Sequence, residues 1–347
     1  MKIIAEYIWL GGNNEIRSKA RTVILDPKKN LKAQHIYTTD LFDFPLWNYD
    51  GSSTEQASTD NSEIILKPVS VYPCPFRKNN NVLVMCDTYN LQNEPIGNRF
   101  LANNIFNEDL MQKPWYGIEQ EYFIMDENNK PFNYSISNKS KQGQFYCSVG
   151  TGNAMCRKIV DEHYNYCLYS GLSISGVNSE VAPSQWEYQI GPVVGIHASD
   201  QLYISRYILL RLSEEFGVFI NFEPKPLDSP WNGSGCHVNF STEDTRNGKG
   251  NKKGVDYIID YIDKLKDNHT LHMENYGKDN NLRMTGSCET ADFNTFSSGT
   301  ANRKASIRIP YGVMQDEKGY FEDRRPSSNM DPYLVTSLMF KTCCLKI

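Results

Sequence analysis

The segment Trp115–Met125 combines two acidic side chains with residue types that favour a buried strand. Aromatic and branched residues dominate it, and the polar turn Asp126–Lys130 follows. Because side chains alternate along a strand, Glu119 and Glu121 are predicted to project from the same face. Two carboxylates about 7 Å apart on one face repel each other unless water surrounds them or a cation lies between them. A solvated strand face and a cation site are therefore both open interpretations of this pair.

Three further segments repeat this pattern of polar side chains on one face and apolar ones on the other. They are Gln185–Ile190 with Glu187 on its polar face and Glu180 just upstream, Cys236–Ser241 with His237, Asn239 and Ser241, and Tyr320–Arg325 with Glu322 and Arg324. Together, the four strands predict a cavity lined by five carboxylates and one imidazole. Oxygen-rich ligand sets suit Mg²⁺ or Mn²⁺, and these ligands outnumber what a single ion requires, so two or more ions are expected.

Arginines supply the opposite charge near these acids. Arg283, Arg303 and Arg308 lie in or beside the polar, Gly- and Ser-rich segment Thr285–Arg308. Guanidinium groups match the geometry of phosphate and carboxylate. Divalent ions and arginines without a covalent nucleophile fit phosphoryl transfer by positioning and charge neutralisation. The sequence contains no P-loop motif and no usable dinucleotide-binding glycine motif. The residues alone therefore predict a metal-dependent enzyme that handles a phosphate and an acidic substrate.

Composition narrows the class of protein. The chain has 347 residues and a net charge of −5 with acids and bases interspersed, so a large core is expected and a nucleic-acid surface is not. We expect no membrane span and no signal peptide, because long apolar runs and a small-residue cleavage site are missing. The nine cysteines lack metal-binding spacing, which favours free thiols, no zinc site and a cytoplasmic location. His269 and His272 are expected on the surface, without a metal.

The elements that position these residues fall into two parts, predicted at 1–92 and 93–347. The first part is mostly β, with strands expected at Lys2–Leu10, Glu15–Leu25, Ile64–Tyr72 and Asn81–Thr88, and a long polar loop at Trp47–Ser62. The second alternates helices and strands, with helices expected at Asn98–Leu110, Ala154–Ser170, Gly254–Leu265 and from an Asp200 cap to Phe216. The residues therefore favour an α/β or α+β catalytic part behind a small β-rich part.

Six motifs resemble the glutamine synthetase family of the eukaryotic type, in order and in approximate spacing. They are Trp47–Thr54, Gly117–Tyr122, Asn178–Glu187, Trp231–Ser241, Ala301–Pro310 and Gly319–Pro326, and they extend along nearly the whole chain. The resemblance implies ligation of ammonia to L-glutamate with ATP, through γ-glutamyl phosphate. It also implies an α+β fold, with a small β-grasp-like N-terminal domain and a larger catalytic domain. The catalytic domain would hold an incomplete, mainly antiparallel β-barrel flanked by helices.

The resemblance also assigns roles to individual residues. One ion would be held by Glu121, Glu180 and Glu187, and the second, which bridges the nucleotide phosphates, by Glu119, His237 and Glu322. Arg283 would bind the α-carboxylate of glutamate in a pocket lined by Asn232 and Gly233, and Arg303, Arg308 and Arg324 would neutralise the transferring phosphoryl group. Asn239, Ser241 and Tyr320 would contact ATP. Glu289 would close a flap over the intermediate, and Asp50 would bind ammonium and take its proton.

Within this family the residue at Asp50 reaches the active site of the neighbouring subunit. The resemblance therefore implies head-to-tail rings, with two five-membered rings stacked into a decamer. The chain departs from the family pattern at Cys288, Pro230 and Lys304, it lacks an expected N-terminal helix, and it ends early at Ile347. These departures place ring contacts and turnover in question. Two alternatives stay open: a structural or regulatory homologue without activity, and a ligase that uses another amine.

Overall fold

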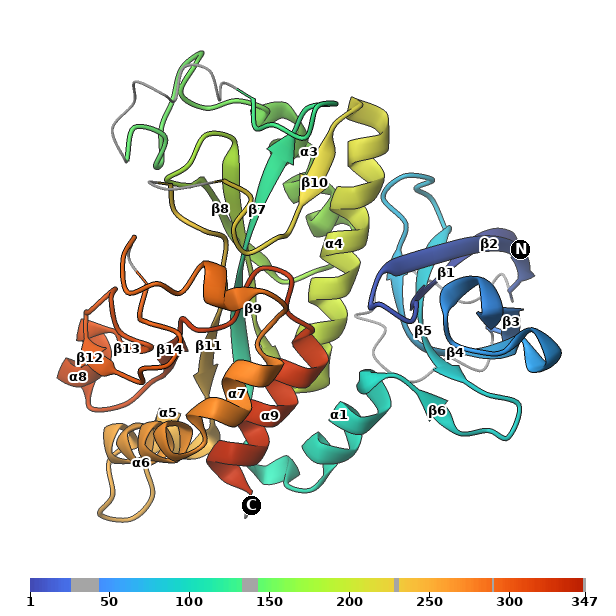
Figure 1. Cartoon of the computed structure of the whole chain (residues 1–347). Helices are drawn as coiled ribbons and strands as arrows, with labels where there is room; N and C mark the ends of the chain where they lie inside the picture. Colours follow the sequence, from blue (N-terminus) through green and yellow to red (C-terminus); the bar gives the residue numbers. More distant parts are fainter. Residues whose placement is uncertain (26–43, 133–142, 228–230, 289, 346–347) are drawn as a thin grey trace.

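The N-terminal part is a twisted sheet that lies beside a larger mixed part (Figure 1). The computed structural model describes residues 1–25, 44–132, 143–227, 231–288 and 290–345. Within these residues the first sheet has six strands in the order β2-β1-β5-β4-β3, with β6 beside β5. Its strands are β1 (Lys2–Leu10), β2 (Ile16–Ile24), β3 (Trp47–Asp50), β4 (Glu63–Pro73), β5 (Val82–Tyr89) and β6 (Pro95–Ile96). The four predicted strands are thus confirmed, with β1 and β5 paired in parallel.

The predicted loop at 47–62 is wrong at its start, where β3 pairs with β4. Two short 3-10 turns follow, at Gly51–Thr54 and Thr59–Asn61. The aromatic residues explain the strand, because the Trp47 ring lies 5.5 Å from that of Tyr7 and the Tyr49 ring lies 4.7 Å from that of Trp9. Burying these rings against the sheet outweighs the polar composition of the segment.

The larger part is built on a curled, open sheet of eight strands among the described residues, in the order β12-β13-β14-β11-β7-β9-β8, with β10 beside β7. These strands are β7 (Trp115–Met125), β8 (Ile174–Ser179), β9 (Gln185–Val194), β10 (Phe219–Asn221), β11 (Cys236–Ser241), β12 (Ser298–Thr300), β13 (Ile307–Ile309) and β14 (Phe321–Asp323). The strands pair antiparallel except β12 with β13. The predicted α+β class with an incomplete, mainly antiparallel barrel is confirmed.

Helices cover the sheet and join the two parts. The described helices are α1 (Asn98–Asn107), α3 (Arg157–Tyr169), α4 (Ile196–Phe216), α5 (Glu243–Asn247), α6 (Gly254–Asp267), α7 (His269–Asn275), α8 (Tyr311–Asp316) and α9 (Pro332–Cys344). The long helix α4 runs between the curled sheet and the N-terminal sheet (Figure 1). Ile8, Leu83 and Met85 of the first sheet share one hydrophobic core with Ile204 and Ile208 of this helix. Because that core is continuous, the division at residue 92 stays a prediction.

Two predictions about single residues are wrong. Asp200 does not cap α4, which begins four residues earlier, at Ile196. Its carboxylate is fully buried instead and accepts hydrogen bonds from Arg99 of α1. His272 is not on the surface: it is fully buried and shares hydrogen bonds with Tyr276 and Thr342. None of the helices in the described ranges combines the length and the hydropathy that a bilayer crossing requires.

Candidate functional site

Strand pairing brings the predicted acidic residues onto one face of the curled sheet. In the centre, β7 lies between β9 and β11, which places Glu119 opposite His237 and Glu121 opposite Glu187. Next to β11, the strand β14 places Glu322 opposite Asn239. The other face of β7 carries Tyr116, Ile118, Tyr122 and Ile124, all buried in the core. The period of two along β7 therefore separates an acidic face from an apolar one, as predicted.

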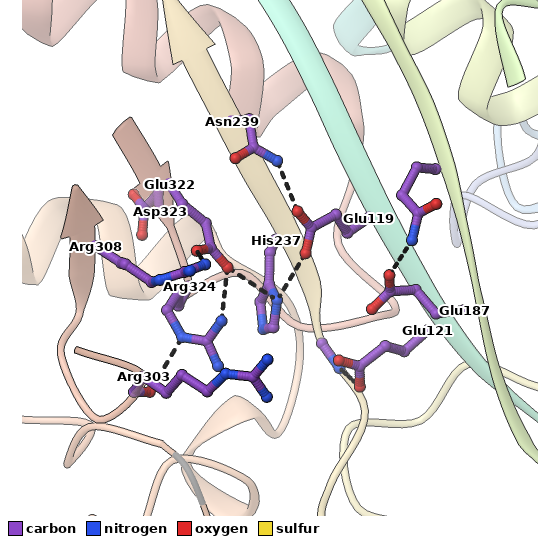
Figure 2. A network of polar contacts seen from close by, with 12 residues as sticks. Glu119, Glu121, Glu187, His237, Asn239, Arg303, Arg308, Glu322, Asp323 and Arg324 are labelled. Carbon is purple, nitrogen blue, oxygen red and sulfur yellow. Dashed lines mark hydrogen bonds and ion pairs between the residues drawn. The ribbon is translucent and has the colours of Figure 1, made fainter. Parts of the chain in front are cut away.

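Glu119, His237 and Glu322 form a compact cluster of possible metal ligands (Figure 2), with one ligand atom from each lying within 4.8 Å of the others. His237 Nδ1 lies 3.5 Å from Glu119 Oε2 and 3.6 Å from Glu322 Oε1. Burial, and then the charge of Arg324, hold the pKa of His237 well below its ordinary value, although Glu322 and Asp323 act in the opposite direction. A neutral imidazole with two carboxylates is a donor set that binds divalent cations, so these residues fit a metal ion.

A second group of acids lines the same cavity, which has a volume of about 130 Å³. Glu121 accepts hydrogen bonds from the amide of Gly235 at 2.8 Å and from Gln185 Nε2 at 3.1 Å. Glu180 accepts one from Asn178 Nδ2 at 2.8 Å, and Glu187 accepts one from Gln189. Burial first, and then neighbouring carboxylates, raise the pKa of both Glu121 and Glu187. A cation among these acids would relieve their repulsion, so this group fits a metal as well.

One wall of the cavity holds Arg283 in a fixed position. Its side chain is buried, and burial lowers its pKa to about 10. Nε donates to Asn280 Oδ1 at 3.1 Å, and Nη2 donates to the carbonyl of Arg325 at 2.7 Å. Only glycine fits beside it, because a Cβ at Gly233 would lie 2.4 Å from both Arg283 Cγ and the Pro224 carbonyl oxygen. Asn232 and Gly233 line the cavity next to this guanidinium.

Three more arginines line the cavity around Glu322. Arg308 Nη1 lies 2.8 Å from Glu322 Oε2, and Arg324 Nη1 lies 2.6 Å from Glu322 Oε1. Arg324 Nε donates to the carbonyl of Arg303, whose own side chain also lines the cavity (Figure 2). The cluster therefore places guanidinium groups beside a candidate metal ligand, which is an arrangement suited to a phosphate.

A larger cavity of about 450 Å³ adjoins the first, since Glu119 lines both. Asn239, Ser241 and Tyr320 line it, as do Trp115 and Arg246. Sequence reasoning missed the last two. Arg246 lies 4.1 Å above the Trp115 ring and donates to Ser241 Oγ at 2.9 Å. The run Arg246–Lys253 is rich in Gly and Asn, which is typical of a loop, but its first two residues belong to the short helix α5, which returns the Arg246 side chain to β7 and β11. The lining, which is more apolar and aromatic than that of the first cavity, suits a planar ring such as a nucleobase.

One predicted residue, Asp50, lines neither cavity. Asp50 is exposed on the N-terminal part, where it accepts hydrogen bonds from the amide of Ser52 at 3.0 Å, Ser52 Oγ at 2.7 Å and Ser53 Oγ at 3.1 Å. Those bonds lower its pKa. Glu289 lies outside the described residues, although its neighbours Cys288 and Thr290 line the first cavity.

Five residues of the first cavity were not predicted as site residues: Tyr146, Asn178, Gln185, Cys288 and Thr290. Gln185 shares a strand parity with Glu187, and Asn178 stands two residues before Glu180, so spacing could have found these two. Both hold a glutamate by a hydrogen bond. Tyr146 and Thr290 come from irregular segments, where no periodicity indicates a direction.

Comparisons with known proteins cover nearly the whole chain. The family model described as the beta-Grasp domain of glutamine synthetase matches residues 19–91, and the one described as its catalytic domain matches residues 102–253. A putative glutamine synthetase of Acanthamoeba polyphaga mimivirus is 50% identical over 345 residues, which are 98% of this chain and 94% of the relative. A glutamine synthetase cytosolic isozyme 1-1 of Oryza sativa subsp. japonica is 49% identical over 98% of this chain and 94% of the relative. A glutamine synthetase of Candida glabrata is 47% identical over 99% of this chain and 89% of the relative.

Proposed function

The chain belongs to the glutamine synthetase family, and we propose that it ligates ammonia to L-glutamate with ATP, giving L-glutamine, ADP and phosphate. The observation that carries the proposal is the convergence of Glu119, His237 and Glu322 within 4.8 Å, beside arginines and between two adjoining cavities. The larger, aromatic cavity would hold the nucleoside of ATP, and the smaller, charged cavity would hold glutamate. The metal cluster lies where the phosphates would join the two.

Two groups of acids would hold Mg²⁺ or Mn²⁺. Glu119, His237 and Glu322 would hold the ion nearer the nucleotide, and Glu121, Glu180 and Glu187 would hold the other. Bound divalent ions would screen the phosphate charges and orient the reacting groups. The pKa shifts support both assignments. Burial and neighbouring carboxylates raise the pKa of Glu121 and Glu187, and burial lowers the pKa of His237, which keeps its imidazole neutral. Glu119 lines both cavities and Glu187 lines the first, and both would help bind the phosphates of ATP.

The arginines and the loop at Gly233 would then bind and orient the substrates. Arg283, with Asn232 and Gly233, would hold the α-carboxylate of glutamate, so that its γ-carboxylate faces the other arginines. A γ-carboxylate oxygen would attack the γ-phosphorus of ATP, and the bond to the β-phosphate would break to release ADP. Arg303, Arg308 and Arg324 would neutralise the phosphoryl group during transfer. Asn239, Ser241 and Tyr320 would contact the nucleoside.

The second half of the reaction needs ammonia and the exclusion of water. Ammonia would attack the carbonyl carbon of γ-glutamyl phosphate, and phosphate would leave with the bonding electrons. We assign Glu289 to a flap that protects this acyl phosphate from hydrolysis, since its neighbours Cys288 and Thr290 line the cavity. In a Glu289→Ala variant the glutamine formed per ATP consumed should fall, and an unchanged ratio would contradict this role.

Asp50 would bind ammonium and accept its proton in the site of a neighbouring subunit. Its place on the exposed surface of the N-terminal part, outside both cavities of its own chain, supports action between subunits. Its lowered pKa keeps it ionised and suited to bind a cation. The assembly would be rings of subunits, with two five-membered rings as the family resemblance implies. Mixing Asp50→Ala with Glu121→Ala protomers should restore activity at low ammonium that neither variant shows alone, and mixtures without that gain would refute a shared site.

The most direct test of the activity is formation of γ-glutamyl hydroxamate from glutamate and hydroxylamine. We expect formation to depend on ATP and on Mg²⁺ or Mn²⁺, and to be lost in His237→Ala. An inactive wild-type protein that still forms rings would favour the alternative of a structural homologue. Faster turnover with methylamine than with ammonium would favour a ligase for another amine. A cytoplasmic location is proposed because the rice relative is named a cytosolic isozyme, and fractionation of cells that express the chain would test it.

A further inference from the structure

Two contacts between charged side chains join the N-terminal sheet to the catalytic part along the seam where they pack together. One contact joins Asp87 of β5 to Arg99 of α1, with Arg99 Nη1 at 3.5 Å from Asp87 Oδ2. Another joins Glu6 of β1 to Arg211 of α4 at 3.8 Å. The first contact is the more buried, since the Asp87 and Arg99 side chains are 10% and 12% exposed. A charge contact of this kind fixes the relative position of two packed surfaces more strictly than apolar packing does.

Arg99 is anchored firmly on the catalytic side of the seam. Its Nε and Nη2 donate to the two carboxylate oxygens of Asp200, each at 2.8 Å. Tyr333 of α9 donates to the same carboxylate at 2.6 Å. This two-point pairing holds the guanidinium plane and leaves Nη1 directed at Asp87. Burial and the charge of Asp200 raise the pKa of Asp87, although Arg99 lies beside it. The Arg99–Asp87 contact across the seam is therefore weaker than the Arg99–Asp200 pair. A substitution at Asp87 can therefore break the seam contact while the Arg99–Asp200 pair persists.

A small cavity at the seam is also lined by a residue from the segment that follows Asp50. This cavity has a volume of about 40 Å³, and Asp87, Arg99 and Gln56 all line it. Gln56 Oε1 accepts hydrogen bonds from Tyr49, the residue before Asp50, at 2.6 Å and from Thr54 at 2.8 Å. Its Nε2 donates to the carbonyl of Leu10 at 3.1 Å. Gln56 therefore connects both sides of the Asp50 turn to the wall of the seam cavity.

We propose that Arg99 is a positioning residue for the ammonium step, acting through Asp87 and Gln56 on the placement of Asp50. This inference rests on the proposed role of Asp50 in the neighbouring subunit. The catalytic part of each subunit fixes its own N-terminal part through Arg99, and the N-terminal part then presents Asp50 to the next subunit. A small rotation at the seam displaces Asp50 from the neighbouring site while the metal, ATP and glutamate groups stay in place, because those groups belong to the catalytic part.

The test compares steady-state constants for the three substrates in Asp87→Asn and Gln56→Ala, using the full-length assembled protein. Since small displacements of a reacting group strongly slow a reaction, we expect the KM for ammonium to rise about three- to tenfold. The KM values for ATP and glutamate should stay within about twofold, as should the binding of Mn²⁺. Arg211→Met is the matched control: it breaks the other charge contact across the seam, away from the Asp50 turn, and should leave all three KM values unchanged.

Three outcomes would overturn the inference. One is an unchanged KM for ammonium in both variants while Asp50→Ala raises it, which leaves the proposed function intact. Another is an equal rise for all three substrates, or an equal rise in Arg211→Met, since either indicates general loosening. The third is dissociation of the assembly in light scattering, which would make the seam an assembly contact. If Asp50→Ala itself leaves the dependence on ammonium unchanged, the proposed role of Asp50 fails, and the positioning role of Arg99 falls with it.

Discussion

Replacing Glu187 by glutamine should stabilise the metal-free protein and weaken its binding of metal. Glu187 is buried, lies opposite Glu121 across the β7–β9 ladder and shares a cavity with Glu119. Directly opposed side chains in a sheet are about 5 Å apart, and at an effective dielectric constant of about 20 two like charges at that distance repel by about 3 kcal/mol. Glutamine keeps the shape of the side chain and removes this repulsion. We expect Glu187→Gln to gain about 1–3 kcal/mol of stability in EDTA, which allows for partial protonation of the pair.

With metal present, the stability gain of Glu187→Gln should shrink or disappear. A ligand that binds only the folded state stabilises it by RT ln(1 + [L]/Kd), so a tenfold weaker Kd at saturating Mn²⁺ removes about 1.4 kcal/mol. Thermal unfolding in EDTA and in Mn²⁺, together with calorimetric titration of Mn²⁺, measures both effects. The exposed Glu274→Gln is the matched control and should change neither. A variant that is less stable than the wild type in EDTA would refute the repulsion, and an unchanged Mn²⁺ affinity would exclude Glu187 as a ligand.

Three further predictions follow from the cavity. The raised pKa values of Glu121 and Glu187 mean that the folded state holds protons which the unfolded chain has released. The metal-free protein should therefore be most stable at acidic pH and lose stability as pH rises through neutrality, and this loss should be smaller in Mn²⁺. A stability that does not change from about pH 5 to about pH 9 would contradict the raised pKa values. Gly233→Ala should raise the KM for glutamate about tenfold or more, because a Cβ there meets the Pro224 carbonyl oxygen at 2.4 Å; equal increases for ATP would argue against a glutamate pocket. Iodoacetamide should inactivate the enzyme by alkylating Cys288, which lines the first cavity. The Cys288→Ser variant should keep its activity under this treatment, whereas the control variant Cys147→Ser should be inactivated like the wild type. Inactivation of Cys288→Ser at the wild-type rate would exclude Cys288 as the reactive thiol.

Strand alternation was enough to predict which acids share a face, but not which acids meet. The parity of Glu119 and Glu121 follows from local sequence, although burial alternates only over the first half of β7 and every residue from Gln120 onward is buried. The pairing of Glu121 with Glu187 depends on the β7–β9 register, which also contains an irregularity between Tyr116 and Ile118. Local periodicity does not contain that information, because register is decided by long-range packing. The resemblance to a family supplied the grouping of ligands that the residues alone left open.

The wrong predictions share one physical cause, which is a partner distant in sequence. Asp200 has the residue type of a helix cap, yet Arg99, 101 residues away, offers it a stronger, two-point interaction. Arg246 begins a Gly- and Asn-rich run that is typical of a loop, yet it lies over the Trp115 ring at the edge of the larger cavity. Propensity describes what a residue prefers with its near neighbours as partners, and tertiary contacts can override that preference.

Function and stability oppose each other on the two faces of β7. The acidic face costs free energy in the absence of cations, because buried like charges repel. The opposite face offsets that cost with Tyr116, Tyr122 and their neighbours, which are fully buried in a core continuous with the N-terminal sheet. A cavity-forming change such as Tyr122→Leu should therefore lower metal affinity as well as stability, since the same strand holds the ligands and the core contacts. The core that secures the metal ligands also extends to the seam, and so the geometry of the acidic site and the placement of Asp50 depend on one packed unit.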